Sequence, residues 1–112
     1  MSAPQNRPAF RRRPTMREST VEAHLRKKAT AAGALVRKMI WPGHRGAPDR
    51  LVIWPEGLGR HSRVDFVELK RPKGKLEAHQ ERKHEELRGH GCYVFTLDNI
   101  EAVDQYIAVR TS

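Results

Sequence analysis

Apolar positions recur at helical spacing in three parts of the chain and give way to short β-rich runs between them. In the first part, Val21, Leu25 and Ala32, with the aliphatic stem of Lys28, form a stripe that stops at Gly33. A stripe at this spacing predicts an amphipathic helix, and a following glycine predicts its end. The predicted helices cover residues 19–32, 76–88 and 98–107.

Two of these helices begin with a capping pattern. Ser19 precedes Glu22 by three residues, and Asp98 precedes Glu101 by the same spacing. This pattern predicts that Ser19 and Asp98 cap their helices with their side chains. The last helix would bury Ile100, Val103 and Ile107.

Four segments between the helices are rich in β-forming residues. Leu35 is followed by Arg37 and Lys38, which favours an outer strand, whereas prolines 48 and 55 enclose an apolar run that favours a buried one. The predicted strands are 34–41, 50–54, 64–70 and 92–97. The order α-β-β-β-α-β-α predicts an α/β fold, a mixed β-sheet flanked by helices.

The charge of the chain points to a polyanionic partner. Its 112 residues fit one domain, and the net charge of +9 with a pI near 10.4 favours nucleic acid. Residues 1–18 hold five arginines and one glutamate, a net +4, and predict a flexible basic arm that is either solvated or grips a strand. The single domain over 19–112 carries the other +5.

Several protein classes are disfavoured by composition. Cys92 is the sole cysteine, so the chain has neither a disulfide framework nor a cysteine zinc site, and a reducing compartment is expected. The chain has no run of 18 apolar residues and no secretory signal pattern at its start. We therefore expect no membrane association and a cytoplasmic location, in a bacterial cell or a phage-infected host.

Candidate chemistry lies in two short motifs, Gly46-Ala47-Pro48-Asp49 and Glu68-Leu69-Lys70. In a strand, Glu68 and Lys70 share a face while Leu69 points into the core. Charged groups on an otherwise apolar strand are costly unless they are paired or bind a metal. Mg²⁺ needs few protein oxygens, so Asp49, Glu68 and the backbone carbonyl of Leu69 would suffice. Lys70 would lower the pKa of an attacking water or neutralise charge at a reacting phosphate, which predicts a phosphodiesterase.

These motifs, followed by Arg71-Pro72-Lys73-Gly74-Lys75-Leu76 and Gln80, resemble the virus-type replication-repair nuclease (VRR-NUC) family over roughly residues 19–108. This family is a branch of the restriction-endonuclease-like PD-(D/E)XK nucleases. The resemblance implies that fold and Mg²⁺- or Mn²⁺-dependent cleavage of DNA. Stand-alone members of this size are similar to four-way-junction (Holliday junction) resolvases that act as homodimers. The implied site residues are the metal ligands Asp49 and Glu68, the catalytic Lys70, an additional metal-site acid Glu22, and Gln80 as a positioning or supporting group.

Each of these residues also has an ordinary structural role. Asp49 alone would suit a turn after a proline, and Glu68 with Lys70 would suit an exposed ion pair. Glu22 is equally explained by the capping pattern, and Gln80 by a helix surface. The ordered combination favours a site over these separate roles.

Basic residues around the motifs predict contacts with phosphates. Arg71, Lys73 and Lys75 directly follow the strand, and His44 and Arg45 precede Asp49; a solvated loop is the alternative. The other histidines form no metal-binding pattern, since His79 and His84 are five residues apart, and are predicted to lie on the surface. The two tryptophans, 41 and 54, are expected in the core or at an interface.

The sequence therefore predicts a metal-dependent, structure-specific DNA endonuclease that recognises DNA shape at branches or flaps, because no base-reading motif is present. A non-catalytic basic DNA-binding protein is the alternative from another class. A metal-dependent nuclease acting on RNA is a third hypothesis.

Overall fold

The computed structural model describes residues 17–56 and 64–112. Three helices and four strands follow one another in the predicted order α-β-β-β-α-β-α. The boundaries lie within a few residues of those predicted for every element. The elements are α1 (Glu18–Ala31), β1 (Leu35–Lys38), β2 (Arg50–Ile53), β3 (Val64–Leu69), α2 (Ala78–Gly89), β4 (Tyr93–Leu97) and α3 (Ile100–Thr111).

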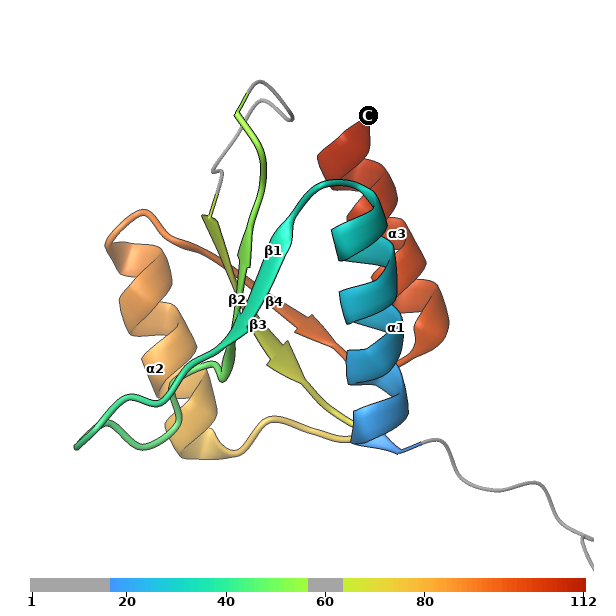
Figure 1. Ribbon diagram of the computed structural model, residues 1–112. Coiled ribbons are helices and arrows are strands. Elements are labelled where there is room, and N and C mark those ends of the chain that lie inside the picture. Colours follow the sequence, from blue (N-terminus) through green and yellow to red (C-terminus); the bar gives the residue numbers. More distant parts are fainter. Residues whose placement is uncertain (1–16, 57–63) are drawn as a thin grey trace, which may run out of the picture.

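The strands form one mixed sheet in the order β1-β2-β3-β4. The first three strands are antiparallel neighbours, and β4 returns parallel to β3 after the α2 crossover. The sheet is covered on both faces: α1 and α3 lie side by side on one face, and α2 lies on the other (Figure 1). The predicted α/β fold with a mixed sheet flanked by helices is therefore confirmed.

The main hydrophobic core fills the space between the sheet and the α1–α3 pair. Alternation along the strands sends Val36, Val52, Val67, Leu69 and Leu97 to this face, where all five are buried. The helices contribute a stripe at i, i+4 and i+8 from α1 and two positions of α3. These helical core residues are Val21, Leu25, Ala29, Val103 and Tyr106.

A buried polar cluster crosses the same core. Asp65 of β3 is 0% exposed, and its carboxylate accepts hydrogen bonds from Trp54 Nε1 (3.1 Å) and the Tyr106 hydroxyl (2.6 Å). Arg110 donates two more, from Nε to Oδ2 (2.7 Å) and from Nη2 to Oδ1 (2.6 Å). Such a bidentate pair fixes both position and orientation, so it locks the end of α3 onto the sheet.

The predicted side-chain caps of α1 and α3 are wrong. Helix α1 begins one residue before Ser19, and its N-cap Arg17 makes no side-chain capping bond. In α3 the cap is Asn99, whose side chain accepts a hydrogen bond from the Ala102 N–H at 2.7 Å, and not Asp98. The buried stripe of α1 uses Ala29, whereas Lys28 is exposed.

The buried face of α3 also differs from the predicted one. Ile107 is half-buried, and Tyr106 and Arg110 take the buried positions beside Val103. Trp54 lies in the core as expected, and half-buried Trp41 packs against Phe66 with ring centroids 6.0 Å apart. Most of the predicted arm, residues 1–16, lies outside the described residues. Among the residues that are described, none of the helices is long and apolar enough to cross a membrane.

Candidate active site

The register of β2 and β3 brings the two motifs together. Arg50 pairs with Val67 across the antiparallel ladder, so Asp49 and Glu68 are the next positions along the two strands. The backbone carbonyl of Asp49 accepts hydrogen bonds from the Met39 N–H (2.9 Å) and from Arg50 Nη1 (3.1 Å). Two carboxylates from distant parts of the sequence thus meet at one edge of the sheet.

The backbone conformation and close packing at position 46 explain why the first motif begins with a glycine. Its φ of +89° lies in the left-handed region, and a Cβ added there would lie 2.5 Å from the His79 carbonyl oxygen and 2.8 Å from its carbon. Both atoms belong to the backbone, so neither can move aside cheaply. The loop before Asp49 therefore presses directly against the first turn of α2.

Glu68 is buried without full compensation for its charge. It is 5% exposed on the sheet face that α2 covers, and its hydrogen-bond partner within the described residues is His84 Nε2 at a long 3.4 Å. Burial, with the negative charges of Asp49 and Glu18, raises the pKa of Glu68 to about 7, while Lys70 and Arg50 oppose the rise. The carboxyl is therefore poised to ionise near neutral pH when a cation approaches.

Asp49 has one satisfied and one unsatisfied oxygen. Its Oδ2 lies 3.2 Å from Arg50 Nη1, whereas its Oδ1 is buried and has no hydrogen-bond partner among the described residues. Buried acceptors in native proteins nearly always have a partner. An unpartnered carboxylate oxygen beside Glu68 is what a cation site requires.

Arg50 connects Asp49 to Glu22. Its Nε lies 3.4 Å from Glu22 Oε2, and the same oxygen accepts a 2.6 Å hydrogen bond from Arg26. Burial alone would raise the pKa of Glu22, but hydrogen bonds and charge from Arg26 and Arg50 outweigh it and lower that pKa. The structure thus brings Glu22 to this edge of the sheet as an ionised, paired carboxylate.

His84 is a correction to the sequence prediction. We predicted a surface residue, but its side chain is 0% exposed, packed between α2 and the sheet beside Glu68. Burial, helped by the charges of Arg88 and Lys70, lowers the pKa of His84, so the imidazole is neutral at pH 7. Its Nδ1 has no partner among the described residues. The contact with Glu68 is therefore a long hydrogen bond from a neutral imidazole and not an ion pair.

Lys70 and Gln80 lie on either side of the loop that joins β3 to α2. The Lys70 N–H extends the parallel ladder by donating to the Leu97 carbonyl (3.0 Å), which fixes the backbone directly after Glu68. The Gln80 side-chain oxygen accepts a hydrogen bond from the Glu77 N–H (2.8 Å) and so caps α2. Gln80 thus has a structural role that the sequence did not reveal.

The donor set fits a divalent cation that needs few protein ligands. Within residues 17–56 and 64–112, no three His, Cys, Asp or Glu side chains form a ready-made metal cluster. Mg²⁺ is usually held by one or two carboxylates, with waters and substrate phosphate completing its shell. Asp49, with an orphaned oxygen, and Glu68, with a raised pKa, satisfy that smaller requirement.

The site also includes three residues that sequence reasoning did not assign to it. Arg50 bridges two acids, Glu18 opens α1 and acts electrostatically on Glu68, and His84 contacts Glu68 directly. Arg50 directly follows Asp49 in the sequence, and this adjacency was the sequence feature that could have assigned Arg50 to the site. The five residues predicted to contact phosphates are all exposed: His44, Arg45, Arg71, Lys73 and Lys75.

Comparison with known proteins gives consistent results. The family model described as the VRR-NUC domain matches residues 4–98. A relative from Acyrthosiphon pisum secondary endosymbiont phage 1, named "Putative nuclease p44", is 38% identical over 84 residues, which cover 75% of this chain and 85% of that protein. A solved structure described as a VRR_NUC domain matches with a TM-score of 0.72 at 38% identity, over 81% of this chain and 94% of the other.

The mixed sheet between helices, with two acids and a lysine at one edge, defines a nuclease domain of the restriction-endonuclease-like class. Within that class, the chain belongs to the VRR-NUC domain family. The resemblance carried by the two sequence motifs is thereby confirmed.

Proposed function

We propose that this protein is a Mg²⁺- or Mn²⁺-dependent endonuclease that hydrolyses phosphodiester bonds in branched DNA, such as four-way junctions, as a homodimer. The observation that carries the proposal is the state of Glu68. The side chain is buried beside Asp49, has one long hydrogen bond to the part of the chain that the structure describes, and has a pKa of about 7. Folding alone would favour a neutral or apolar side chain at such a position.

Asp49 and Glu68 are the metal ligands in this proposal, with the backbone carbonyl of Leu69 as a further oxygen. A bound divalent cation supplies charge stabilisation and a more acidic water for phosphodiester hydrolysis. Glu22 is an additional acid of the same site, and it would bind the metal only after its contact with Arg50 is broken. We therefore expect Glu22 to matter less than the other two acids.

Lys70 and Gln80 have different roles in the reaction. The charge of Lys70 already acts on Glu68, so its ammonium is close enough to the site to stabilise negative charge on a reacting phosphate or to favour loss of a proton from the attacking water. Gln80 is a positioning residue: it fixes the start of α2, the helix that carries His84 to Glu68.

The basic surface supports a nucleic-acid substrate. Arg45 and the loop residues Arg71, Lys73 and Lys75 are exposed next to the site, where they would contact the phosphate backbone. The described elements include no helix-turn-helix or other base-reading unit. Recognition would therefore depend on DNA shape, which favours junctions and flaps.

An apolar row on the sheet supports a homodimer. Leu35 of β1, Ile53 of β2 and Val64 of β3 are neighbours across the sheet, and Leu35 and Val64 are 48% and 38% exposed. They lie on the same face as α2, which packs mainly against β4. A second copy would cover this row and bring two sites to one junction. Sedimentation should show a dimer at micromolar concentration, and a monomer throughout that range would contradict this part of the proposal.

The direct test is cleavage of matched four-way-junction, flap and linear duplex DNAs and of an RNA duplex, each with Mg²⁺, Mn²⁺ or EDTA. Wild type is compared with Glu68→Ala, Lys70→Ala and the control Glu101→Gln, which changes an exposed carboxylate of α3. We expect metal-dependent cuts in the junction, lost in the two site variants and kept in the control.

The other results discriminate between the alternatives. Cleavage of RNA in preference to every DNA would change the substrate class. DNA binding without cuts under any condition would replace the proposed nuclease with a non-catalytic DNA-binding protein.

A further inference from the structure

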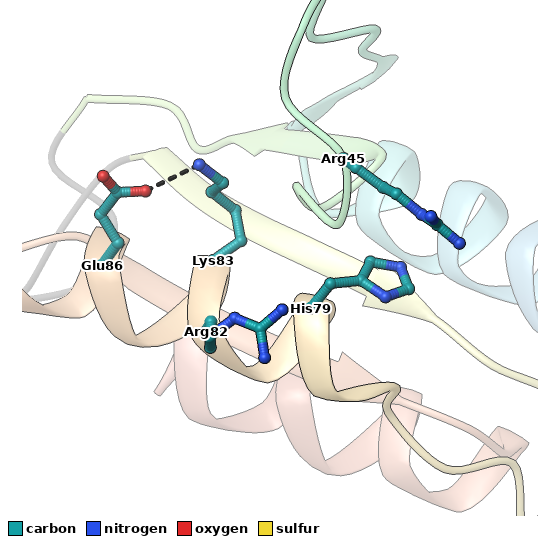
Figure 2. A pocket seen from close by; sticks show the side chains of 5 residues that line it. All are labelled: Arg45, His79, Arg82, Lys83 and Glu86. Carbon is teal, nitrogen blue, oxygen red and sulfur yellow. Dashed lines mark hydrogen bonds and ion pairs between the residues drawn. The ribbon is translucent and has the colours of Figure 1, made fainter.

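A second feature of the surface lies beside the site, between the Pro42–Gly46 loop and α2. It is an open groove of about 590 Å³, lined by Arg45 from the loop and by His79, Arg82, Lys83 and Glu86 from α2. The four helical positions follow an i, i+3, i+4, i+7 pattern, so they form one face of the helix. Figure 2 shows Arg45 across the groove from this face, with the Arg82 side chain extending along the helix toward His79.

The groove is built for an anion. Arg45, Arg82 and Lys83 provide three permanent positive charges, and Glu86 is the single carboxylate in the lining. Glu86 is paired with Lys83 at 2.8 Å, and this hydrogen bond lowers the pKa of Glu86, so the carboxylate is ionised at neutral pH. Lys83 Nζ also lies 3.4 Å from His44 Nδ1 of the loop. The two walls are therefore joined through Lys83.

The groove and the candidate active site share two elements, the loop before Asp49 and helix α2. Gly46, three residues before Asp49, presses against the His79 backbone at the groove's end. The other wall of the groove is α2. In this helix, Lys83 of the groove is followed directly by His84, whose buried side chain contacts Glu68. A ligand lying along this face of α2 would thus lie against the loop that leads to Asp49.

The dimensions suit a polymer with repeated charges. At 1.5 Å per residue, the α2 face from His79 to Glu86 is about 10 Å long. One strand of a duplex advances about 3.4 Å per phosphate along the axis, so this length spans about three phosphates. A small anion would occupy only part of such an open trough.

We propose that this groove binds two or three consecutive phosphates of a nucleic-acid strand and leads that strand to Asp49 and Glu68. The inference rests on the proposed nuclease function and extends it by naming where the substrate lies on α2. Arg82 and Lys83 are phosphate-binding residues in this account, and Arg45 closes the groove from the loop side. The exposed basic loop of Arg71, Lys73 and Lys75 runs into the start of the same helix, which would continue the path.

The test measures how DNA affinity depends on salt. Four-way-junction DNA is titrated with three proteins: the groove variant Arg82→Gln/Lys83→Gln, the control Lys27→Gln/Lys28→Gln and the parent chain. The control removes the same charge from exposed positions of α1. All three chains also carry Glu68→Gln and are measured with Mg²⁺, so that the DNA stays intact. Arg45→Gln serves as a second groove variant from a different element. Thermal unfolding confirms that each variant is folded.

We expect the groove variant to lower the slope of log K against log salt by about 2, because each lost phosphate contact removes about 0.9. Its affinity near 0.1 M salt should fall at least about tenfold, while the control keeps the parent slope. Equal slopes and affinities in groove and control variants would overturn the inference. A wild-type chain that binds DNA yet never cuts it would instead contradict the proposed nuclease, and the salt slopes would still decide whether the groove binds phosphate.

Discussion

Two buried carboxylates lie three residues apart on β3, on opposite faces of the sheet, and their surroundings differ completely. Asp65 accepts four hydrogen bonds, two of them from Arg110. Glu68 has a 3.4 Å contact with neutral His84 and lies beside another acid, Asp49. Both are charged residues in a mostly apolar strand, so burial alone does not distinguish them. The number of hydrogen bonds distinguishes them: the fully bonded Asp65 stabilises the fold, and the poorly bonded Glu68 is the carboxylate that we propose as a metal ligand.

The largest expected effect is on catalysis. Glu68→Gln should lower the rate of metal-dependent cleavage by about 10³-fold or more, because the amide keeps the size of the side chain but cannot provide an anionic ligand. The measurement is single-turnover cleavage of junction DNA, with Glu101→Gln as the matched control. A decrease in rate of less than about tenfold would contradict the assignment of Glu68 as a metal ligand.

The second effect is on stability and should belong to Asp65. Asp65→Asn leaves buried Arg110 without its counter-charge, so the free energy of unfolding should fall by about 3–5 kcal/mol. Urea unfolding measures this loss, and Asp104→Asn, an exposed carboxylate paired with His24, should change it by less than about 0.5 kcal/mol. If Asp65→Asn is as stable as wild type, the bonded network is not what holds α3.

A pH series separates the two carboxylates further. The pKa of Glu68 is raised from 4.5 to about 7, so the folded protein holds this proton more tightly than the unfolded chain does. Its contribution to stability is complete below about pH 4.5 and is lost as the pH rises through about 7. In EDTA, Glu68→Gln should therefore gain stability relative to wild type with rising pH, by up to about 3 kcal/mol at pH 8. A difference that stays constant from pH 4.5 to 8 would show that Glu68 is not electrostatically strained.

The position of Asp49 depends on the close approach at Gly46. Gly46→Ala combines a left-handed φ with a Cβ placed 2.5 Å from the His79 carbonyl oxygen, so it should cost about 2 kcal/mol of stability and displace the loop. Cleavage should fall more than stability predicts, because Asp49 moves with the loop. Gly43→Ala is the matched control, since its φ is also positive (+77°) but nothing lies within 4 Å of an added Cβ. Equal cleavage by the two variants would show that the close contact at Gly46 does not position Asp49.

The smallest effect should come from a charge pair that is exposed. Glu86→Gln releases Lys83 from its 2.8 Å partner and removes the carboxylate from the groove on α2. DNA affinity should rise about two- to fivefold at low salt, because the Lys83 ammonium is released for phosphate and a carboxylate that repels phosphate is removed. The gain should shrink at high salt, where screening weakens all these interactions, and fluorescence titration at two salt concentrations measures it. Weaker binding by Glu86→Gln would contradict the assignment of Lys83 to phosphate.

The sequence predicted the order of elements because each has its own local signal. Alternation placed Leu69 in the core and Glu68 on the opposite face, and the family motifs placed Glu68 and Asp49 in one site. The caps were less predictable. Asp98 and Asn99 are adjacent and are equally good capping residues, and the choice of Asn99 depends on where the chain leaves β4.

What the sequence could not predict depends on contacts between distant elements. His84 lies on a helix with a mostly polar sequence, and only the packing of α2 onto the sheet buries it against Glu68. Arg110 resembles an exposed residue at a helix end until Asp65 is placed opposite it, 45 positions earlier in the chain. The four hydrogen bonds of Asp65 and the single long one that Glu68 makes within the described residues both become visible only in three dimensions.

The measurement that tests this difference most directly is calorimetric titration of Mn²⁺ into wild type and Glu68→Gln, without DNA, at about pH 6 and about pH 8. Binding must displace the proton that Glu68 holds below its pKa of about 7. Wild type should therefore bind Mn²⁺ more tightly at the higher pH and release a proton at the lower one, and Glu68→Gln should bind weakly at both. Equal Mn²⁺ affinity in the two proteins, at either pH, would contradict the assignment of Glu68 as a metal ligand.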